Sequence, residues 1–190
     1  MKGLIILSNG FEDVEALATI DLLRRAKITI DMVSIDKDLS VQTSHGVIIQ
    51  AEKTLKDINL NDYSFLVIPG GKAVFNTLVD SRVVESMVEF FNKKNQLIAC
   101  ICAAPMVLGK MGLLRDKEYV CYPGCENETF EGTYKENENV VRVDNIITSK
   151  ACGTVFDFAL EIIDYLLGSV ASKRIKNEIY FNWFIKYFLI

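Results

Sequence analysis

Short apolar runs alternate along the chain with longer stretches in which apolar residues recur at helical spacing. The short runs, rich in Ile and Val, predict strands at 4–7, 29–35, 65–68 and 97–101, with another near residue 119. The helical spacing predicts helices at 14–26, 81–93, from 105 onward, and at 155–167. Residues 41–50 read as a strand pair or bulged ribbon on one edge, and 140–143 with 146–148 as a second ribbon.

This alternation predicts an α/β fold with a doubly wound, mostly parallel sheet and helices on both faces. In such a sheet the ligand crevice lies beyond the carboxyl ends of the strands. Residues 9–15, 69–71 and 102–105 each follow a predicted strand at that end. We therefore expect these three segments to converge on one site.

Composition narrows the class of protein. The chain has 190 residues, half of them hydrophobic and 24% charged, which is typical of one soluble globular domain. The net charge of −4 argues against nucleic acid as a partner. We see no export signal and no apolar run long enough to span a membrane, so we expect a cytoplasmic protein without a membrane partner.

Three further segments carry weaker signals. The polar stretch 126–139 reads as an inserted loop or a short helix. Residues 179–190 form an aromatic run broken by Asn182 and Lys186, which we expect to dock on the body or on a second subunit. The five cysteines, an odd number, indicate reduced thiols rather than a disulfide framework.

Cys102 stands at the end of a predicted strand, directly before a helix that opens at Pro105. A thiol on such a sharp turn lies near free backbone N–H groups and the positive end of a helix dipole, which favour the thiolate. The arrangement is similar to a nucleophile elbow with cysteine in place of serine. The alternative is an inert, buried cysteine, which Cys100 two residues earlier is expected to be.

Carboxylates crowd the start of the first predicted helix. Glu12 and Asp13 are explained as favourable partners of the helix dipole. Glu15 lies one turn in, on a side expected to face the core, where a carboxyl without a cation keeps its proton. A protonated Glu15 could donate a hydrogen bond to a thiolate. Gly70 and Gly71 let backbone N–H groups approach an oxyanion, although two glycines after a strand are common in turns.

Four segments together resemble the DJ-one branch of the ThiJ/PfpI superfamily. They are Asn9-Gly10-Phe11-Glu12-Asp13-Val14-Glu15, Val67-Ile68-Pro69-Gly70-Gly71, Ala99-Cys100-Ile101-Cys102-Ala103-Ala104-Pro105 and Gly153-Thr154-Val155-Phe156-Asp157-Phe158. The resemblance implies a flavodoxin-like three-layer sandwich in one domain, 1–190, whose last ~20 residues form a helical extension, and a homodimer. It also implies Cys102 as the reactive cysteine, Glu15 as its protonated neighbour, and Gly70, Gly71 and Ala103 as the oxyanion site.

The sequence departs from the family pattern at several positions. Tyr122 stands where many relatives have a histidine, and Ala103 stands where the peptidase-like branch has one, so a Cys-His triad and peptidase activity are not expected. The single histidine, His45, occupies a position where relatives often have arginine. It could shape an anion site with Arg25 of a neighbouring subunit, or be an ordinary loop histidine.

The remaining cysteines are Cys121, Cys125 and Cys152. With one histidine and a Cys121–Cys125 spacing unlike that of a zinc ribbon, we expect no metal. A resolving thiol is the better interpretation, and Cys152 borders the predicted crevice.

Two functions from different classes follow from these residues. The first is cofactor-free processing of small α-oxoaldehydes or glycated substrates, in which the Cys102 thiolate attacks an aldehyde and Glu15 moves the proton. The second is a redox-sensing or chaperone-like stress protein in which Cys102 is oxidised and Glu15 stabilises the product.

Overall fold

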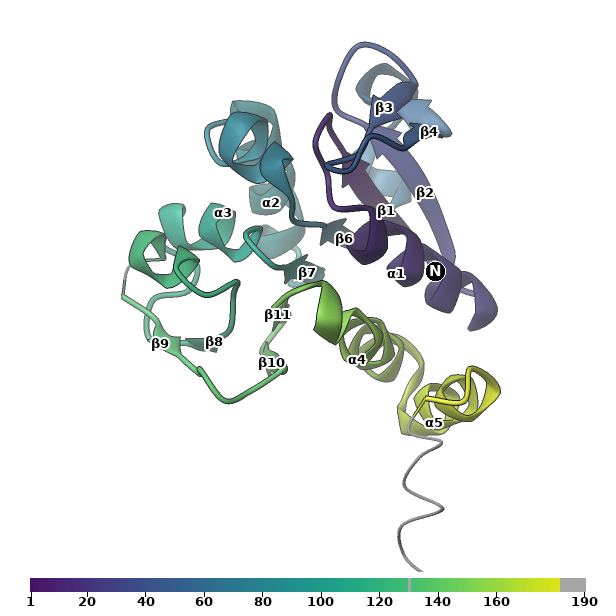
Figure 1. The fold of residues 1–190 in the computed structure, drawn as a ribbon, viewed down its shortest axis with the longest axis vertical. Coiled ribbons are helices and arrows are strands. Elements are labelled where there is room, and N and C mark those ends of the chain that lie inside the picture. The colour runs from purple at the N-terminus through teal and green to yellow at the C-terminus, as the bar shows by residue number, and fades with distance from the viewer. Residues whose placement is uncertain (130, 182–190) are drawn as a thin grey trace, which may run out of the picture.

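The computed structural model describes residues 1–129 and 131–181 and is built on one seven-stranded sheet (Figure 1). Its strand order is β10-β11-β7-β6-β1-β2-β5. The strands are β1 (Lys2–Leu7), β2 (Thr29–Ser34), β5 (Lys53–Thr54), β6 (Phe65–Ile68), β7 (Leu97–Ile101), β10 (Val140–Val143) and β11 (Ile146–Ser149). All neighbours pair in parallel except β10, which is antiparallel to β11. The predicted α/β fold with a mostly parallel sheet is confirmed.

Helices cover both faces of this sheet (Figure 1). They are α1 (Asp13–Arg25), α2 (Arg82–Lys93), α3 (Pro105–Lys110), α4 (Val155–Leu167) and α5 (Ser169–Glu178). α1 and α4 pack against each other on one face, whereas α2 packs on β6 and β7 from the other. Every residue of β6 and β7 is buried, because a parallel strand covered on both faces needs apolar side chains in both directions.

The predicted strand pair at 41–50 is present, but it does not lie on the edge of the main sheet. β3 (Ser40–Gln42) and β4 (Ile48–Gln50) pair antiparallel, but they form a sheet of their own, and β5 is the edge of the main sheet. The hairpin loop instead leans on the segment after β1, where Thr43 and Phe11 form an isolated bridge. The hairpin therefore borders the carboxyl end of the main sheet rather than extending it.

The region after α3 is the least regular. It contains β8 (Glu118–Tyr119) paired in parallel with β9 (Thr133–Tyr134), and a short helical turn, η4 (Cys125–Glu128). Further short turns are η1 (Leu55–Asp57), η2 (Leu60–Asp62), the π-helical η3 (Val74–Leu78) and η5 (Cys152–Thr154). The strand expected near residue 119 is present, and the polar stretch holds a short helix and a short strand.

The predicted C-terminal extension begins with α5, which packs on α4. The ring of Phe181 lies 5.6 Å from that of Phe156 on α4, between centroids. Most of the aromatic run, 182–190, lies outside the described residues, so its docking stays a prediction. Among the described helices, none combines the length and the apolar character that crossing a bilayer requires.

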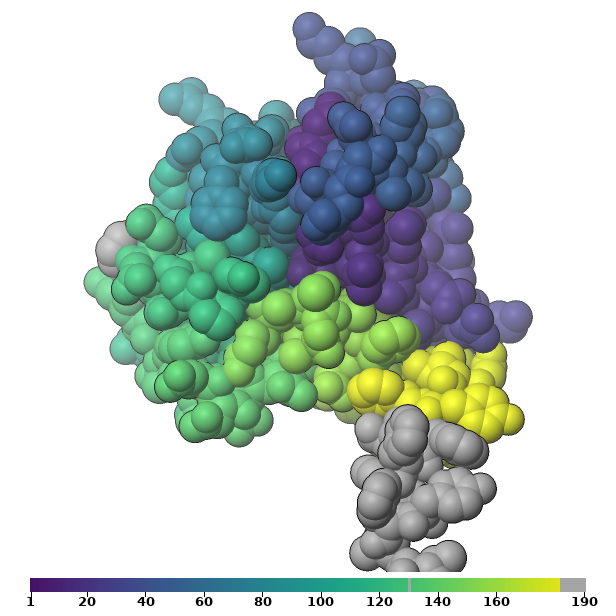
Figure 2. Space-filling view, in the orientation of Figure 1, coloured from purple at the N-terminus to yellow at the C-terminus, as the bar shows by residue number. Residues whose placement is uncertain are grey.

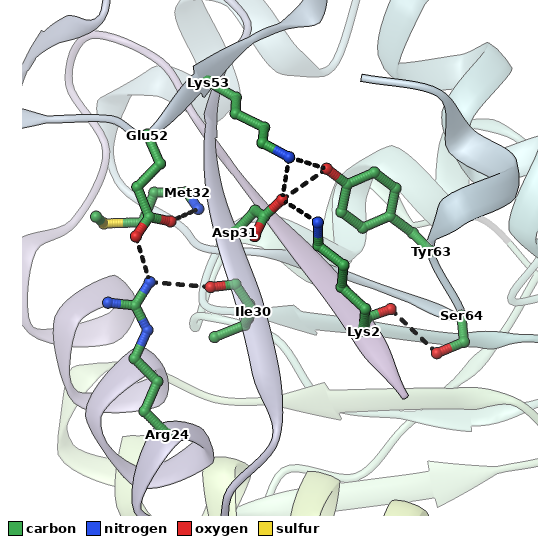
Figure 3. A network of polar contacts seen from close by, with 9 residues as sticks. All are labelled: Lys2, Arg24, Ile30, Asp31, Met32, Glu52, Lys53, Tyr63 and Ser64. Atoms are coloured by element: carbon green, nitrogen blue, oxygen red, sulfur yellow. Dashed lines mark hydrogen bonds and ion pairs between the residues drawn. The ribbon is translucent and has the colours of Figure 1, made fainter. Parts of the chain in front are cut away.

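A polar network fastens the opposite, amino end of the sheet (Figure 3). Asp31 on β2 accepts from the ammonium groups of Lys2 and Lys53, each 2.8 Å away, and from the hydroxyl of Tyr63 at 2.7 Å. Beside it, Glu52 pairs with Arg24 of α1 at 2.8 Å. These contacts join β1, β2, β5 and α1 and leave the carboxyl end free for a site.

Candidate active site

Cys102 occupies the turn between β7 and α3 in a left-handed backbone conformation, with φ of 65°. This conformation is unfavourable for a residue with a Cβ, so its surroundings must hold it. The N–H of Cys102 donates to Ser149 O at 3.0 Å, and its C=O accepts from the N–H of Tyr122 at 2.8 Å. Pro105 follows as the first residue of α3. The predicted strand-to-helix elbow is therefore present, and hydrogen bonds to both its N–H and its C=O hold it in place.

Glu15 lies in the first turn of α1 with only 1% of its surface exposed. Its neighbour Val14 points outward and is 49% exposed, so the helix turns Glu15 inward, as its position in the sequence predicts. Its Oε2 accepts a hydrogen bond from the N–H of Gly70 at 2.8 Å. α1 thus carries a buried carboxyl to the loop that follows β6.

The thiol of Cys102 and the carboxyl of Glu15 converge on Gly70. A Cβ placed on Gly70 would lie 2.7 Å from Glu15 Oε2 and 2.9 Å from Cys102 Sγ. Both reactive atoms are therefore within 3 Å of one point, and only glycine leaves that point empty. The segments after β1, β6 and β7 meet here, as the topology predicts.

The two acids influence each other's protonation. Burial raises the pKa of Glu15 to about 7, although hydrogen bonds from Gly70 and Cys102 oppose it, and the charge of Glu12 raises it further. Burial also raises the pKa of the Cys102 thiol, and an ionised Glu15 raises it more. Two negative charges in one buried place are costly, so the pair holds at most one negative charge near neutral pH. The expected lowering of the thiol pKa by the turn is thus outweighed by burial, and further by the charge of Glu15 when it is ionised.

The backbone donors at the site are divided between the two acids. The N–H groups of Gly71 and Ala103 face Cys102 and lower its pKa, as the predicted dipole effect requires. The N–H of Gly70 is donated to Glu15 instead, and its C=O accepts from Glu12 N at 3.1 Å. Gly70 therefore positions Glu15, and the expected role of its N–H as an oxyanion donor stays a prediction. Gly71 and Ala103 are left as donors beside the sulfur.

His45 lies at the edge of this region, on the β3–β4 hairpin. Its Nδ1 is 2.9 Å from Asp13 Oδ2 and 3.6 Å from Glu12 Oε1. The other oxygen of Asp13, Oδ1, accepts from the hydroxyl of Thr43 at 2.7 Å. His45 therefore lies against two carboxylates, and it is hydrogen-bonded to that of Asp13.

Comparison with known proteins identifies the family. The DJ-1/PfpI family model matches residues 1–165. The chain belongs to the DJ-1/PfpI family.

Individual members of the family align over nearly the whole chain. Protein DJ-1alpha of Drosophila melanogaster is 34% identical over 184 residues, covering 96% of this chain and 85% of that protein. The protein named glutathione-independent glyoxalase DJ-1 of Schizosaccharomyces pombe is 32% identical over 189 residues, covering 95% and 96%. The crystal structure of Drosophila melanogaster DJ-1beta superimposes with a TM-score of 0.88 at 30% identity, covering 94% and 96%. The fold is thus that of DJ-1 proteins.

Tyr122 stands where a histidine is expected from the family pattern. Its backbone N–H binds the elbow at Cys102, and the residue is 51% exposed. Arg25, the other residue of the expected anion site, binds Asp21 at 2.8 Å and Glu178 at 3.3 Å. Within one chain His45 and Arg25 are each paired with carboxylates and do not form an anion site together. A contribution of Arg25 from a neighbouring subunit stays a prediction.

The remaining thiols differ in their exposure to solvent. Cys100, Cys121 and Cys125 are buried, and burial raises the pKa of Cys121 to about 12. Cys152 is exposed in η5, three residues after Ser149. The carbonyl oxygen of Ser149 accepts a hydrogen bond from the N–H of Cys102. The hydroxyls of Ser149 and Thr154 lie 2.7 Å apart and fasten that loop. Of the candidate resolving thiols, only Cys152 is open to solvent.

Proposed function

We propose that this chain is a cofactor-free enzyme that converts small α-oxoaldehydes, such as methylglyoxal, to hydroxy acids. The observation that carries the proposal is the convergence of the Cys102 thiol and the buried Glu15 carboxyl on Gly70. A nucleophile and a proton carrier in contact are what this conversion needs. The name of the Schizosaccharomyces pombe relative supports the substrate class.

The first step forms a carbon–sulfur bond. The sulfur of Cys102 attacks the aldehyde carbon, and its proton passes through Glu15 to the aldehyde oxygen, giving a hemithioacetal. The N–H groups of Gly71 and Ala103 stabilise charge that develops beside the sulfur. The thiolate–acid and thiol–carboxylate forms of the pair carry the same single proton, so both lead to the same product.

The second step moves hydrogen between adjacent carbons. Ionised Glu15 removes the proton from the former aldehyde carbon and returns it to the neighbouring carbonyl carbon, while the hydroxyl proton of the hemithioacetal moves to the former ketone oxygen. This isomerisation leaves a 2-hydroxy thioester on Cys102. A carboxyl with a pKa of about 7 suits both the removal and the return of a proton near neutral pH. Water then hydrolyses the thioester, and Cys102 is released.

The decisive experiment compares wild type with Cys102→Ser and Glu15→Gln, using methylglyoxal as substrate and enzymatic assay of D- and L-lactate. We expect lactate from wild type only. Cys100→Ala is the matched control, because it removes a buried thiol from the same strand and should retain activity. Absence of lactate from wild type, or equal lactate from Cys102→Ser, refutes the proposal.

A second candidate function is redox sensing, with or without chaperone-like activity. It is favoured by the half-buried Cys102 with two backbone donors and Glu15 around its sulfur, a setting that can hold a sulfinate. Peroxide titration followed by intact mass and peptide mapping tests it. A selective gain of two oxygens on Cys102 supports sensing, and oxidation spread over all five thiols contradicts it.

We also propose that the protein is a homodimer. Exposed apolar side chains gather on α1 and on the adjoining β3–β4 hairpin, which Thr43 ties to Asp13. They are Val14, Leu17, Val47 and Ile48. Exposed apolar side chains on neighbouring elements are a feature of subunit contacts where they form one patch. Light scattering during gel filtration tests the proposal, and a monomeric mass at micromolar concentration contradicts it.

A further inference from the structure

The proposed reaction releases one proton in each turnover, and the structure must let that proton leave. An α-oxoaldehyde plus water gives a hydroxy acid, which ionises to the carboxylate and a proton at neutral pH. The inference below rests on this proposed function. Glu15, the carboxyl in contact with Cys102, is 1% exposed and cannot deliver the proton to bulk water directly.

Glu12 is more open to solvent than Glu15 and lies near it at the start of α1. The two residues are three apart at the start of α1, where such side chains are neighbours on a helix surface. The side chain of Glu12 is 16% exposed, and partial burial raises its pKa. The charge of Glu12 in turn raises the pKa of Glu15. Glu12 also donates its backbone N–H to Gly70, the residue that holds Glu15.

His45 follows Glu12 at the surface. Its Nδ1 lies 3.6 Å from Glu12 Oε1 and 2.9 Å from Asp13 Oδ2, and its side chain is 68% exposed. Thr43 holds the second oxygen of Asp13, so the imidazole is oriented by a carboxylate that is itself oriented. Figure 2 shows the hairpin that carries His45 lying against the start of α1 on one face of the molecule.

We infer that Glu12 and the Asp13-held His45 form the exit by which the reaction's proton passes from Glu15 to solvent. His45 does not touch the substrate in this assignment; it is a positioning residue that takes up and releases a proton through Glu12. Histidine suits the role because its charge changes near neutral pH. The role also accounts for the hydrogen bond to Asp13, which holds an exposed loop side chain in one orientation.

The charged groups around His45 favour uptake of a proton. The hydrogen bond to Asp13 and the charge of Glu12 raise the pKa of His45, and Lys72 across the loop lowers it. The hydrogen bond between Thr43 and Asp13 keeps the pKa of Asp13 low despite partial burial, so Asp13 remains a carboxylate. The imidazole therefore accepts protons from the buried side and exchanges them with water.

The test measures kcat and KM for methylglyoxal in weakly and strongly buffered solution, over a range of pH. In weak buffer we expect His45→Gln and Asp13→Asn to lower kcat about tenfold or more at unchanged KM. Added imidazole should restore kcat in both variants. Wild type and the control Glu89→Gln, an exposed residue of α2, should be insensitive to imidazole.

Each outcome bears on the inference separately from the proposed function. If wild type forms lactate and His45→Gln keeps the wild-type kcat and pH profile in weak buffer, the proton exit is refuted and the enzyme assignment stands. A lower kcat that imidazole does not restore also refutes it, because that result indicates a structural role. If wild type forms no lactate, the proposed function fails and the inference fails with it.

Discussion

Gly70 donates its backbone N–H to Oε2 of Glu15 across 2.8 Å, and this bond orients the carboxyl that contacts the Cys102 thiol. The same residue leaves room for the sulfur, since its missing side chain is the space in which Cys102 and Glu15 meet. One glycine therefore sets both the direction of the carboxyl and the separation of the two groups.

Gly70→Ala should disable the site. The added Cβ would lie 2.5 Å from Cys102 Cβ and 2.7 Å from Glu15 Oε2, so one of the two must move. We expect a loss of about 1–3 kcal/mol in the free energy of unfolding and a fall in kcat/KM of about a hundredfold from misplacement of the reacting groups. Urea unfolding and lactate formation measure the two effects.

Gly153→Ala is the matched control for this substitution. Its Cβ meets no atom within 4 Å, so it should change stability by less than about 0.5 kcal/mol. Wild-type behaviour of Gly70→Ala in both assays would show that the thiol and carboxyl do not depend on this contact.

Glu15 should make the protein less stable as the pH rises. Its folded pKa of about 7 is above the ordinary value of 4.5, so the folded state binds more protons than the unfolded state between these values. The stabilisation is complete below about pH 4.5 and is lost as the pH rises through 7. The full shift corresponds to about 3 kcal/mol.

Glu15→Gln removes this titration and keeps an acceptor for the N–H of Gly70. Urea unfolding between pH 5 and pH 8 should show wild type losing stability relative to the variant as the pH increases. A constant difference across this range would mean that Glu15 titrates normally and is not the buried acid described above.

The strands and helices that place the site could be predicted because their apolar periodicity is strong. The helix expected at 81–93 is α2, Arg82–Lys93, and the strand expected at 97–101 is β7, Leu97–Ile101. The inward direction of Glu15 followed from helical period as well. These features depend on local pattern, which a single sequence carries.

The protonation and bonding of the site could not be predicted in the same way. Whether the N–H of Gly70 serves an oxyanion or Glu15 depends on how far α1 is from the loop after β6, a distance set by packing. The raised pKa of Cys102 likewise follows from burial and from Glu15, both tertiary features. The pairing of His45 with Asp13 joins residues 32 apart, and no spacing in the sequence signals it.

Mild oxidation should link Cys102 to Cys152. A hydroperoxide oxidises the Cys102 thiol to a sulfenic acid with release of water or alcohol, and the Cys152 thiol then displaces hydroxide as water to form the disulfide. Cys152 is the exposed candidate, in a loop joined to Cys102 through Ser149. Non-reducing peptide mapping should find the linked pair in wild type.

Two variants provide the controls for the disulfide. Cys152→Ser should shift oxidation of Cys102 toward the sulfinate, because no thiol intercepts the sulfenic acid. Cys125→Ser, which removes a buried thiol, should leave the link intact. A map of oxidised wild type without the Cys102–Cys152 peptide would exclude Cys152 as the resolving thiol.

Asp31 should stabilise the amino end of the sheet in a manner that acid removes. Burial alone would raise the pKa of Asp31, but hydrogen bonds from Lys2, Lys53 and Tyr63 outweigh it and lower the pKa to about 2. The contribution is present above the unfolded value of 3.8 and is lost as the pH falls toward 2. The shift corresponds to about 2 kcal/mol, and solvent screening of the partly exposed lysines reduces it to about 1 kcal/mol.

Asp31→Asn should therefore be less stable than wild type at pH 7 and nearly equal to it at pH 2. Asp38→Asn, at an exposed position, should match wild type throughout urea unfolding at both pH values. If Asp31→Asn is as stable as wild type at pH 7, the network of Figure 3 contributes no net stability through this carboxylate.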